Sequence, residues 1–215
     1  MSATHPRERR ADWEPVPVKR PPGLTRRWAH RLLALFGWTA DVAWPPGPRA
    51  VIIVYPHTSN WDFIVGIVAR YAVGLPVHWL AKDTLFRWPL AGVFRRWGGI
   101  PVNRRQSTGF TGQLAEEFGR RSWMWLAITP EGTRARRDYW KSGFYHLALE
   151  AQVPVGMAFI DYRQRKVGLS RYVSLTGDVH RDMEEIRAAY AGKIACHPEN
   201  AGPIHLREEQ GPVPA

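Results

Sequence analysis

Residues 51–62 read Val-Ile-Ile-Val-Tyr-Pro-His-Thr-Ser-Asn-Trp-Asp, and the rest of the chain is organised around this stretch. The four apolar residues at its start predict a buried β-strand, which Pro56 ends. The three residues that follow His57 are all good N-cap residues for a helix that continues over residues 61–72. The stretch therefore predicts a strand, then a loop that carries His57, then a helix whose first turn carries Asp62.

His57 and Asp62 are the candidate catalytic pair. Two residues five apart on one helix point about 140° apart, because each residue turns the chain by roughly 100°. The two side chains can touch only if His57 lies on the loop and folds back over the first helical turn. In that arrangement they form a general base and the carboxylate that orients it. This spacing also arises by chance, so the pair needs support from elsewhere in the chain.

The composition points to an anionic partner. The formal net charge is +11, the isoelectric point is near 10.4, and only five of the 30 basic residues are lysine. Arginine forks suit phosphate groups, whether on a lipid headgroup or on a nucleic acid. Eleven tryptophans accompany the arginines. Arginine mixed with tryptophan is typical of a protein at a membrane interface, and nucleic-acid binding remains an open alternative on composition alone.

Several classes of site and segment are not expected. The single cysteine, Cys196, excludes an internal disulfide framework and fits a reducing compartment. The first 23 residues lack the apolar core of a secretory signal. The sequence also has no run of 18 apolar residues, which a membrane span would need. The other histidines have no ligand spacing, so no metal site is predicted.

The chain divides into four predicted segments. Residues 1–23 are rich in arginine and proline and predict a flexible basic arm, with a pinned arm as the alternative. Residues 24–49 predict an amphipathic membrane-associating helix and a linker; a helix packed on the core is the alternative. Residues 50–196 have the length of one α/β domain, and residues 197–215 predict an irregular tail.

Predicted strands and helices alternate between residues 50 and 196. This order predicts an α/β fold with a mixed, partly parallel central sheet flanked by helices. The expected strands are 51–54, 76–81, 98–104, 123–128, 153–160, 166–169 and 172–175. The expected helices after 61–72 are 86–97, 107–120, 141–150 and 182–190.

Chemically useful side chains follow four of these strands. His57, Lys82 and Arg104 come just past three strand ends, and the run Glu131-Gly132-Thr133-Arg134 follows a fourth. Ligand sites in open α/β sheets lie at the carboxyl ends of the strands. We therefore expect these residues to gather at one edge of the sheet.

With these residues assembled, the chain resembles the glycerolipid acyltransferase superfamily of lysophosphatidic acid and glycerol-3-phosphate acyltransferases. Residues 57–62 match its His-x4-Asp motif, residues 99–104 resemble its second block, residues 129–134 match its Pro-Glu-Gly-Thr-Arg block, and residues 153–155 match its fourth. Lys82 stands in an Ala-Lys block that is also typical of the family. Two departures, Thr129 for an aromatic residue and Asn103 for an acidic one, leave the acceptor open.

The resemblance implies a role for each candidate. His57 would deprotonate the acceptor hydroxyl as it attacks an acyl thioester, with Asp62 orienting the imidazole, and no acyl-enzyme would form. Arg134 and Arg104 would hold an acceptor phosphate, with Lys82 as a further charge. Gly132 would allow the tight turn beside Thr133, and Glu131 would bind an acceptor hydroxyl or fix Arg134. Backbone amides at the start of helix 61–72 would stabilise the oxyanion.

The implied partners are anionic membrane lipids, a lysophospholipid acceptor and acyl-CoA or acyl carrier protein as co-substrate, with no other cofactor. The expected place is peripheral or monotopic on the cytoplasmic face of the cell membrane. Two alternatives stay open. One is the same chemistry on glycerol phosphate, a glycolipid or an amino-acid lipid. The other is a non-catalytic basic protein that binds membrane or nucleic acid, although motifs placed at buried strand ends argue against nucleic acid as the partner.

Overall fold

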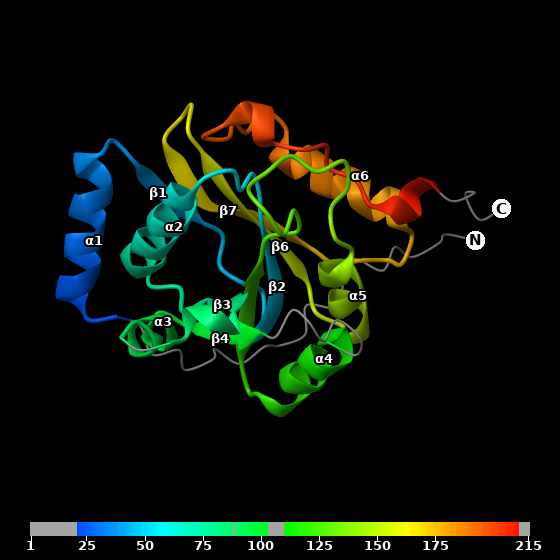
Figure 1. The fold of residues 1–215 in the computed structure, drawn as a ribbon, viewed down its shortest axis with the longest axis horizontal. Coiled ribbons are helices and arrows are strands. Elements are labelled where there is room, and N and C mark those ends of the chain that lie inside the picture. Colours follow the sequence, from blue (N-terminus) through cyan, green and yellow to red (C-terminus); the bar gives the residue numbers. More distant parts are fainter. Residues whose placement is uncertain (1–20, 88, 103–109, 211–215) are drawn as a thin grey trace, which may run out of the picture.

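The structure, a computed structural model, describes residues 21–87, 89–102 and 110–210, which form a seven-stranded sheet with helices on both faces (Figure 1). The strands are β1 (Thr39–Val42), β2 (Arg49–Val54), β3 (His78–Lys82), β4 (Gly99–Val102), β5 (Met124–Ile128), β6 (Val155–Asp161) and β7 (Lys166–Val173). The helices are α1 (Gly23–Leu35), α2 (Asn60–Val73), α3 (Ala91–Arg96), α4 (Phe110–Arg120), α5 (Gly143–Glu150) and α6 (Val179–Tyr190).

The strand order across the sheet is β1-β7-β6-β2-β5-β3-β4. Every neighbouring pair is parallel except β6 and β7, which run antiparallel. The predicted α/β fold with a mixed, partly parallel sheet is confirmed. Because β2, β5 and β6 are parallel neighbours, their carboxyl ends meet at one edge of the sheet, and that edge carries the candidate site.

The central strand β2 is buried on both faces. Val51 and Ile53 pack in the main core cluster with side chains of α4, α5 and α6, whereas Ala50 and Ile52 face a second cluster on the opposite side. All four side chains are at most 2% exposed. Burial on both faces explains why the strand reads as a continuous apolar run instead of alternating with polar residues.

Helix α2 begins and ends where its sequence dictates. Ser59 caps its start by accepting a hydrogen bond from the Trp61 N–H, and Asp62 completes a capping box. Gly74 ends it in the left-handed region with φ of 75°. The buried side of α2 packs against α1 through Ala69 and Ala72, so α1 and α2 lie together on one side of the sheet (Figure 1).

The segment predicted as helix and linker is partly wrong. Helix α1 stops at Leu35, Gly37 turns the chain with φ of 72°, and β1 then pairs in parallel with β7. The α/β domain therefore begins before residue 50. β1 could not be predicted from the sequence, because it is only four residues long and pairs with a strand more than 120 residues away.

Three other predictions differ from the structure. Of the described residues within 86–97, only Ala91–Arg96 is helical, since Pro89 is disfavoured inside a helix that begins at residue 86. Residues 166–173 form one strand, because β6 pairs with it along its length. The predicted irregular tail is packed as far as residue 210: it carries two short 3-10 turns, η2 (Pro198–Asn200) and η3 (Arg207–Gln210), and its Leu206 is fully buried in the main core.

The predicted basic arm lies almost wholly outside the described residues, which start at 21. In the part of the chain that is described, no helix combines the length and the apolar content needed to cross a membrane.

Candidate active site

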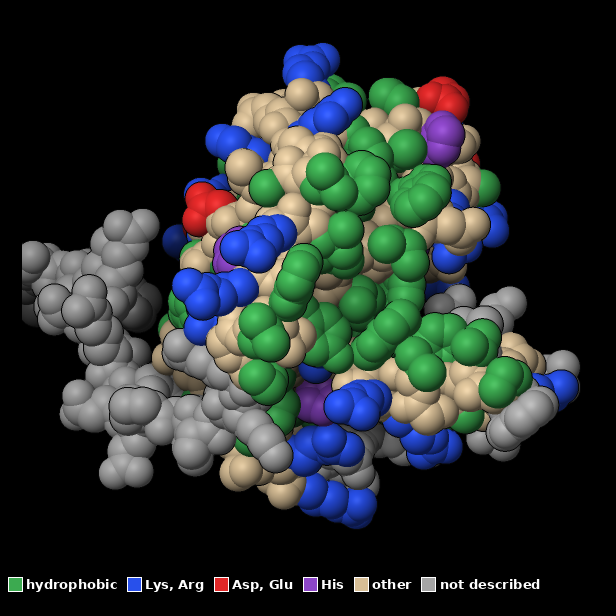
Figure 2. Space-filling model, turned by 90° about the vertical axis from the view of Figure 1, so that its left-hand side faces the viewer, with side chains coloured by type: hydrophobic (Ala, Val, Ile, Leu, Met, Phe, Trp, Pro, Cys, Tyr) green, Lys and Arg blue, Asp and Glu red, His purple; other side chains and the backbone are tan. Residues whose placement is uncertain are grey.

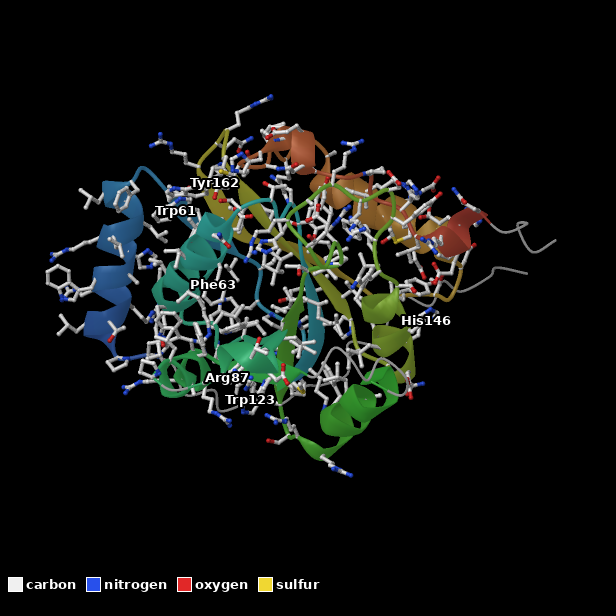
Figure 3. The ribbon with its side chains drawn as sticks, in the orientation of Figure 1. Trp61, Phe63, Arg87, Trp123, His146 and Tyr162 are labelled. Carbon is white, nitrogen blue, oxygen red and sulfur yellow. The ribbon has the colours of Figure 1, made fainter. Side chains whose placement is uncertain are left out.

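Three neighbouring strands deliver polar side chains to the same edge of the sheet. His57 follows β2, Glu131 follows β5, and Tyr162 comes directly after β6. The strand order places β2 between the other two. The side chains of His57 and Glu131 were expected there from the sequence, whereas Tyr162 was not. Figure 3 shows Tyr162 at the end of α2 that carries Trp61, the helical turn in which Asp62 lies.

The predicted contact between His57 and Asp62 is present. The Nδ1 atom of His57 lies 3.2 Å from Oδ2 of Asp62. The imidazole is 15% exposed and the carboxylate 2%, so the outer side of the ring alone can meet a ligand. With Nδ1 donating to the carboxylate, Nε2 is the nitrogen that can accept a proton.

Asp62 is held by four donors. Its Oδ2 accepts the backbone N–H groups of Thr58 and Ser59, each at 2.8 Å, in addition to His57. Its Oδ1 accepts the hydroxyl of Tyr162 at 2.8 Å. Burial by itself raises the pKa of Asp62, but the hydrogen bonds from His57, Ser59 and Tyr162 outweigh burial and lower that pKa below its ordinary value. The carboxylate is therefore ionised when the site is assembled.

Glu131 contacts the backbone of His57. The sequence instead favoured a role in fixing Arg134. Its Oε2 accepts the His57 N–H at 2.8 Å, and the side chain is 4% exposed. Burial raises the pKa of Glu131 to about 7, although hydrogen bonds from the N–H groups of His57 and Gly202 act in the opposite direction. Glu131 thus positions the loop that carries His57.

Most backbone amides of the loop before α2 are already engaged, which bears on the oxyanion role predicted for amides at the start of that helix. The N–H groups of His57, Thr58, Ser59 and Trp61 already donate to Glu131, to Asp62 (twice) and to the Ser59 hydroxyl. A group that already donates a good hydrogen bond has little left for an oxyanion. The amides of Thr58, Ser59 and Trp61 bind the side chains of Asp62 and Ser59, as expected for residues that cap a helix.

A large apolar cavity of about 770 Å³ opens beside His57 and Asp62. It lies between α2 and the sheet, and its volume falls in the roughly 300–1,000 Å³ of ligand pockets. Its walls are mainly aliphatic and aromatic; they include Ile52, Phe63, Ile67, Trp79, Phe94, Trp97 and Leu169. An elongated apolar ligand could lie here with its reactive end at the imidazole.

The predicted run after β5 is divided between this cavity and its surroundings. Gly132, Thr133 and Arg134 line the cavity together with His57. Gly132 has φ of 66°, and a Cβ there would lie 3.0 Å from the Lys141 side chain, so the turn requires glycine. Of the other predicted phosphate ligands, Arg104 and the side chain of Lys82 lie outside the described residues. Arg134 is the predicted cation that the structure brings to the cavity.

The C-terminal segment, residues 194–206, braces the His57 loop, which the sequence did not indicate. The N–H of His197 donates to Oγ1 of Thr58 at 3.1 Å. The hydroxyl of Tyr55 donates to the carbonyl of Gly202 at 3.0 Å, and Gly202 also contacts Glu131. These contacts come from single residues without periodicity, so no pattern announces them. Tyr162, in contrast, obeys the strand-end rule and could have been found by it.

An exposed apolar face runs along α1. Leu24, Trp28, Leu32 and Leu35 repeat at helical spacing on one side, and with Phe36 they are 45–77% exposed. Figure 2 shows hydrophobic side chains gathered across the middle of this side of the molecule, with many Lys and Arg and few Asp and Glu around them. Exposed apolar patches of this kind mark sites that bind another protein or a membrane.

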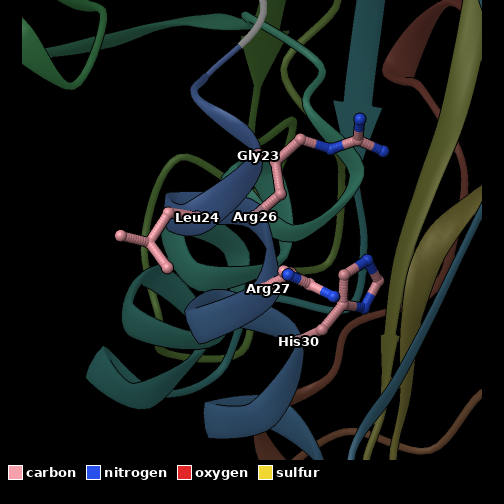
Figure 4. A pocket seen from close by; sticks show the side chains of 5 residues that line it. All are labelled: Gly23, Leu24, Arg26, Arg27 and His30. Atoms are coloured by element: carbon pink, nitrogen blue, oxygen red, sulfur yellow. The ribbon is translucent and has the colours of Figure 1, made fainter.

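A separate hollow of about 500 Å³ lies at the N-terminal end of α1. Arg26, Arg27 and His30 line it, while Leu24 points away from Arg26 and His30 (Figure 4). None of the predicted site residues borders it. Among the described residues, no group of three or more His, Cys, Asp or Glu side chains could hold a metal ion.

The sequence of the chain is similar to those of known proteins. The sequence model of a family described as Acyltransferase matches residues 45–157, which are 113 of the 215 residues. The chain is 28% identical over 152 residues to a 1-acyl-sn-glycerol-3-phosphate acyltransferase of Escherichia coli strain K12, covering 66% of this chain and 60% of that protein. It is 27% identical over 164 residues to the enzyme of the same name from Haemophilus influenzae, covering 70% and 65%. The chain thus spans somewhat less than two thirds of the length of these curated relatives.

A solved structure shares the fold. The crystal structure of the 1-acyl-sn-glycerophosphate (LPA) acyltransferase PlsC from Thermotoga maritima superposes with a TM-score of 0.53 at 17% identity, covering 77% of each chain. At this identity the likeness concerns the α/β fold.

Proposed function

The chain belongs to the Acyltransferase family, and on that premise we propose that it transfers a fatty acyl group from an acyl thioester to a hydroxyl of a lysophospholipid such as lysophosphatidic acid. The observation that carries the proposal is the position of the His57 imidazole, hydrogen-bonded to a buried carboxylate and open to an apolar cavity of about 770 Å³. A base at the end of a lipid-sized cavity is the arrangement that such a transfer requires.

The proposed step needs one base. Nε2 of His57 accepts the proton of the acceptor hydroxyl as the oxygen attacks the thioester carbonyl carbon. The carbon–sulfur bond then breaks, and the imidazolium returns the proton to the departing thiolate, so His57 is restored. Asp62 keeps Nδ1 protonated and stabilises the imidazolium while it exists. No side chain is acylated, because a thioester is reactive enough for direct attack.

The two substrates are assigned to different parts of the site. The acyl chain lies along the mainly aliphatic and aromatic walls between α2 and the sheet. The acceptor phosphate meets Arg134, whose planar guanidinium can bind it through two hydrogen bonds. Asn60 and Thr133 also line the cavity and are candidates for donating to the oxyanion, since the amides of Thr58 and Ser59 are already engaged.

We further propose that α1 lies on the bilayer surface. Its exposed apolar face would enter the boundary of the acyl chains, and Arg27 and Arg31 beside it would meet lipid phosphates. Ala29 and Leu33 pack on α2 at the same time, so both readings of this helix apply to different sides of it. The association is peripheral, and the arginines favour an anionic leaflet such as the cytoplasmic one.

The test is an acyl-transfer assay with the purified full chain. Isotope-labelled acyl-CoA is offered with lysophosphatidic acid in phosphatidylglycerol-containing vesicles, and the product is identified by mass spectrometry. Glycerol phosphate and a total membrane lipid extract are offered in parallel, because the same chemistry could serve another acceptor. We expect labelled phosphatidic acid with the wild type and none with His57→Ala.

Two outcomes would change the proposal. Label in another lipid or in glycerol phosphate would keep the chemistry and replace the acceptor. Absence of label in every arm, also with acyl carrier protein as the acyl donor, would reject the enzyme and leave the non-catalytic alternative, which predicts salt-sensitive binding to anionic vesicles or DNA.

A further inference from the structure

We propose that Tyr162 is a positioning residue for the acyl-transfer reaction: its hydroxyl fixes the Asp62 carboxylate in the orientation that holds His57. The Tyr162 hydroxyl donates to Oδ1 of Asp62 at 2.8 Å, while Oδ2 faces Nδ1 of His57 at 3.2 Å. The two contacts lie on opposite oxygens of one carboxylate. This inference rests on the proposed function, since it assigns a role within that site.

The distribution of donors on Asp62 shows why the tyrosine matters. Oδ2 accepts two backbone N–H groups as well as His57, but the one hydrogen bond described for Oδ1 comes from Tyr162. Because Asp62 is 2% exposed, water cannot readily replace a lost donor. Without the hydroxyl, Oδ1 would be buried without a donor, and the carboxylate would lose the contact that fixes its orientation toward the imidazole.

Tyr162 is itself rigidly held. Its N–H donates to the carbonyl of Ile194 at 2.9 Å, and its ring packs edge-on against Trp38 with ring centroids 5.0 Å apart. Burial and the neighbouring Asp62 raise the pKa of Tyr162 far above its ordinary value, so the hydroxyl is a permanent donor. Because Tyr162 is held through its backbone, its ring and its hydroxyl, it keeps the Asp62 carboxylate in one orientation. A flexible donor would not.

The ionisable groups around the pair define how the effect can be measured. Asp62 faces His57 and Tyr162, and the charge of Glu131 also acts across this space. The thiol of Cys196 lies beside the Tyr162 hydroxyl. Removing the hydroxyl makes Asp62 a stronger base, so the His57–Asp62 pair holds a proton more tightly. The acid limb of the rate profile should therefore move to higher pH.

The chain offers a matched control in a second tyrosine–aspartate pair. The hydroxyl of Tyr145 donates to Oδ2 of Asp182 at 2.9 Å, and Asp182 accepts the N–H groups of Thr176 and Gly177 before α6. The hydrogen bonds are of the same kind, and Asp182 is also 2% exposed. No histidine takes part in the hydrogen bonds described for this second pair. Tyr145→Phe therefore reproduces the loss of a buried hydroxyl away from the reaction.

The experiment compares Tyr162→Phe with Tyr145→Phe in the purified full chain. Rates with acyl-CoA and lysophosphatidic acid are measured from pH 5 to 9, and unfolding temperatures are recorded for both. For Tyr162→Phe we expect kcat to fall about tenfold to a hundredfold, as for a lost hydrogen bond to a charged group. The acid limb should rise by about one pH unit, with KM for the acceptor within about twofold. Tyr145→Phe should lower the unfolding temperature and leave the profile unchanged.

A second variant guards against misfolding. Placing 3-fluorotyrosine at position 162 keeps the shape and makes the hydroxyl a stronger donor, so the acid limb should move to lower pH, opposite to Tyr162→Phe. Equal profiles for all variants, or an altered KM alone, would overturn the role. If the wild type transfers no acyl group, the proposed function fails separately; the positioning role is then judged by NMR titration of the His57 imidazole, which Tyr162→Phe must shift to higher pH and Tyr145→Phe must not.

Discussion

The side chain of Glu131 holds the backbone of His57: Oε2 accepts the His57 N–H at 2.8 Å across 74 residues of sequence. This bond joins the strand ends of β5 and β2 and fixes the start of the loop that carries the base. The acid is nearly fully buried, and burial raises its pKa to about 7. The brace is therefore an ionisable group whose charge changes near neutral pH.

Glu131 should make stability depend on pH in a definite direction. The unfolded chain releases this proton near the ordinary pKa of 4.5, whereas the folded chain keeps it until about 7. The contribution to the free energy of unfolding is therefore complete below pH 4.5 and is lost as pH rises toward 7. Glu131→Gln cannot ionise. Its unfolding free energy, measured by urea unfolding, should therefore increase relative to that of the wild type as pH rises through this window. A difference that stays flat or falls with pH would contradict this assignment.

Replacing Glu131 by alanine separates the hydrogen bond from the charge. Glu131→Ala leaves the buried His57 N–H without its acceptor, which should cost about 1–3 kcal/mol. Acyl transfer should fall further than in Glu131→Gln, which keeps an oxygen in place. Comparison of the two rates at pH 7 checks whether the acceptor, more than the charge, sustains activity.

His57 and Asp62 should fail in different ways when they are replaced. His57→Ala removes the base and should reduce the rate about 10²–10⁴-fold with little change in unfolding temperature, because its imidazole makes a single described hydrogen bond. Asp62→Asn loses activity and also weakens the cap of α2, so it should be less stable. Asp182→Asn at α6 is the matched control, expected to lose stability and retain the rate.

Helix α1 should determine membrane binding through its exposed side. Trp28→Glu combined with Leu35→Glu should reduce binding to anionic vesicles by at least about tenfold, since each side chain withdraws an apolar contact of about 1.5–3 kcal/mol. Ala34→Glu adds a charge at an exposed position on another side of the helix and should bind nearly as the wild type does. Vesicle sedimentation measures both. Deleting residues 1–44 is not a suitable test, because it would remove β1 from the sheet.

Gly66 should set how much acyl chain the cavity accepts. It lines the cavity from α2, and a Cβ added there meets no atom within 4 Å. Gly66→Ala should stabilise the helix by about 0.5–1 kcal/mol and change little else. Gly66→Leu should lower the rate with long acyl-CoA more than with short acyl-CoA, because its side chain would enter the cavity. Equal losses for all chain lengths would place the acyl group elsewhere.

Elements buried on both sides could be predicted from the sequence, and elements defined by distant partners could not. β2 and β5 read as apolar runs because both faces are covered, and α2 carries its own cap in Ser59 and Asp62. β1 is half-exposed and four residues long, so neither composition nor alternation marks it. Its strand conformation depends on β7, which supplies the pairing.

The site shows the same division. His57, Asp62 and the run after β5 could be found, because motif spacing and strand ends are local properties of the sequence. The actual partner of Glu131 could not, since a backbone N–H has no signature of its own. Tyr162 follows a strand end and was overlooked because it is a single aromatic residue next to charged ones.

The C-terminal brace gives the molecule an order of assembly during translation. The segment that reaches Thr58 and Glu131 is synthesised after every strand of the sheet, whereas α1, the proposed membrane-facing helix, leaves the ribosome before any of them. Because chains fold from the N-terminus as they emerge, the surface helix is available while the loop of His57 still lacks its last contacts. If α1 binds the bilayer as proposed, the nascent protein can therefore reach it before the proposed active site is complete.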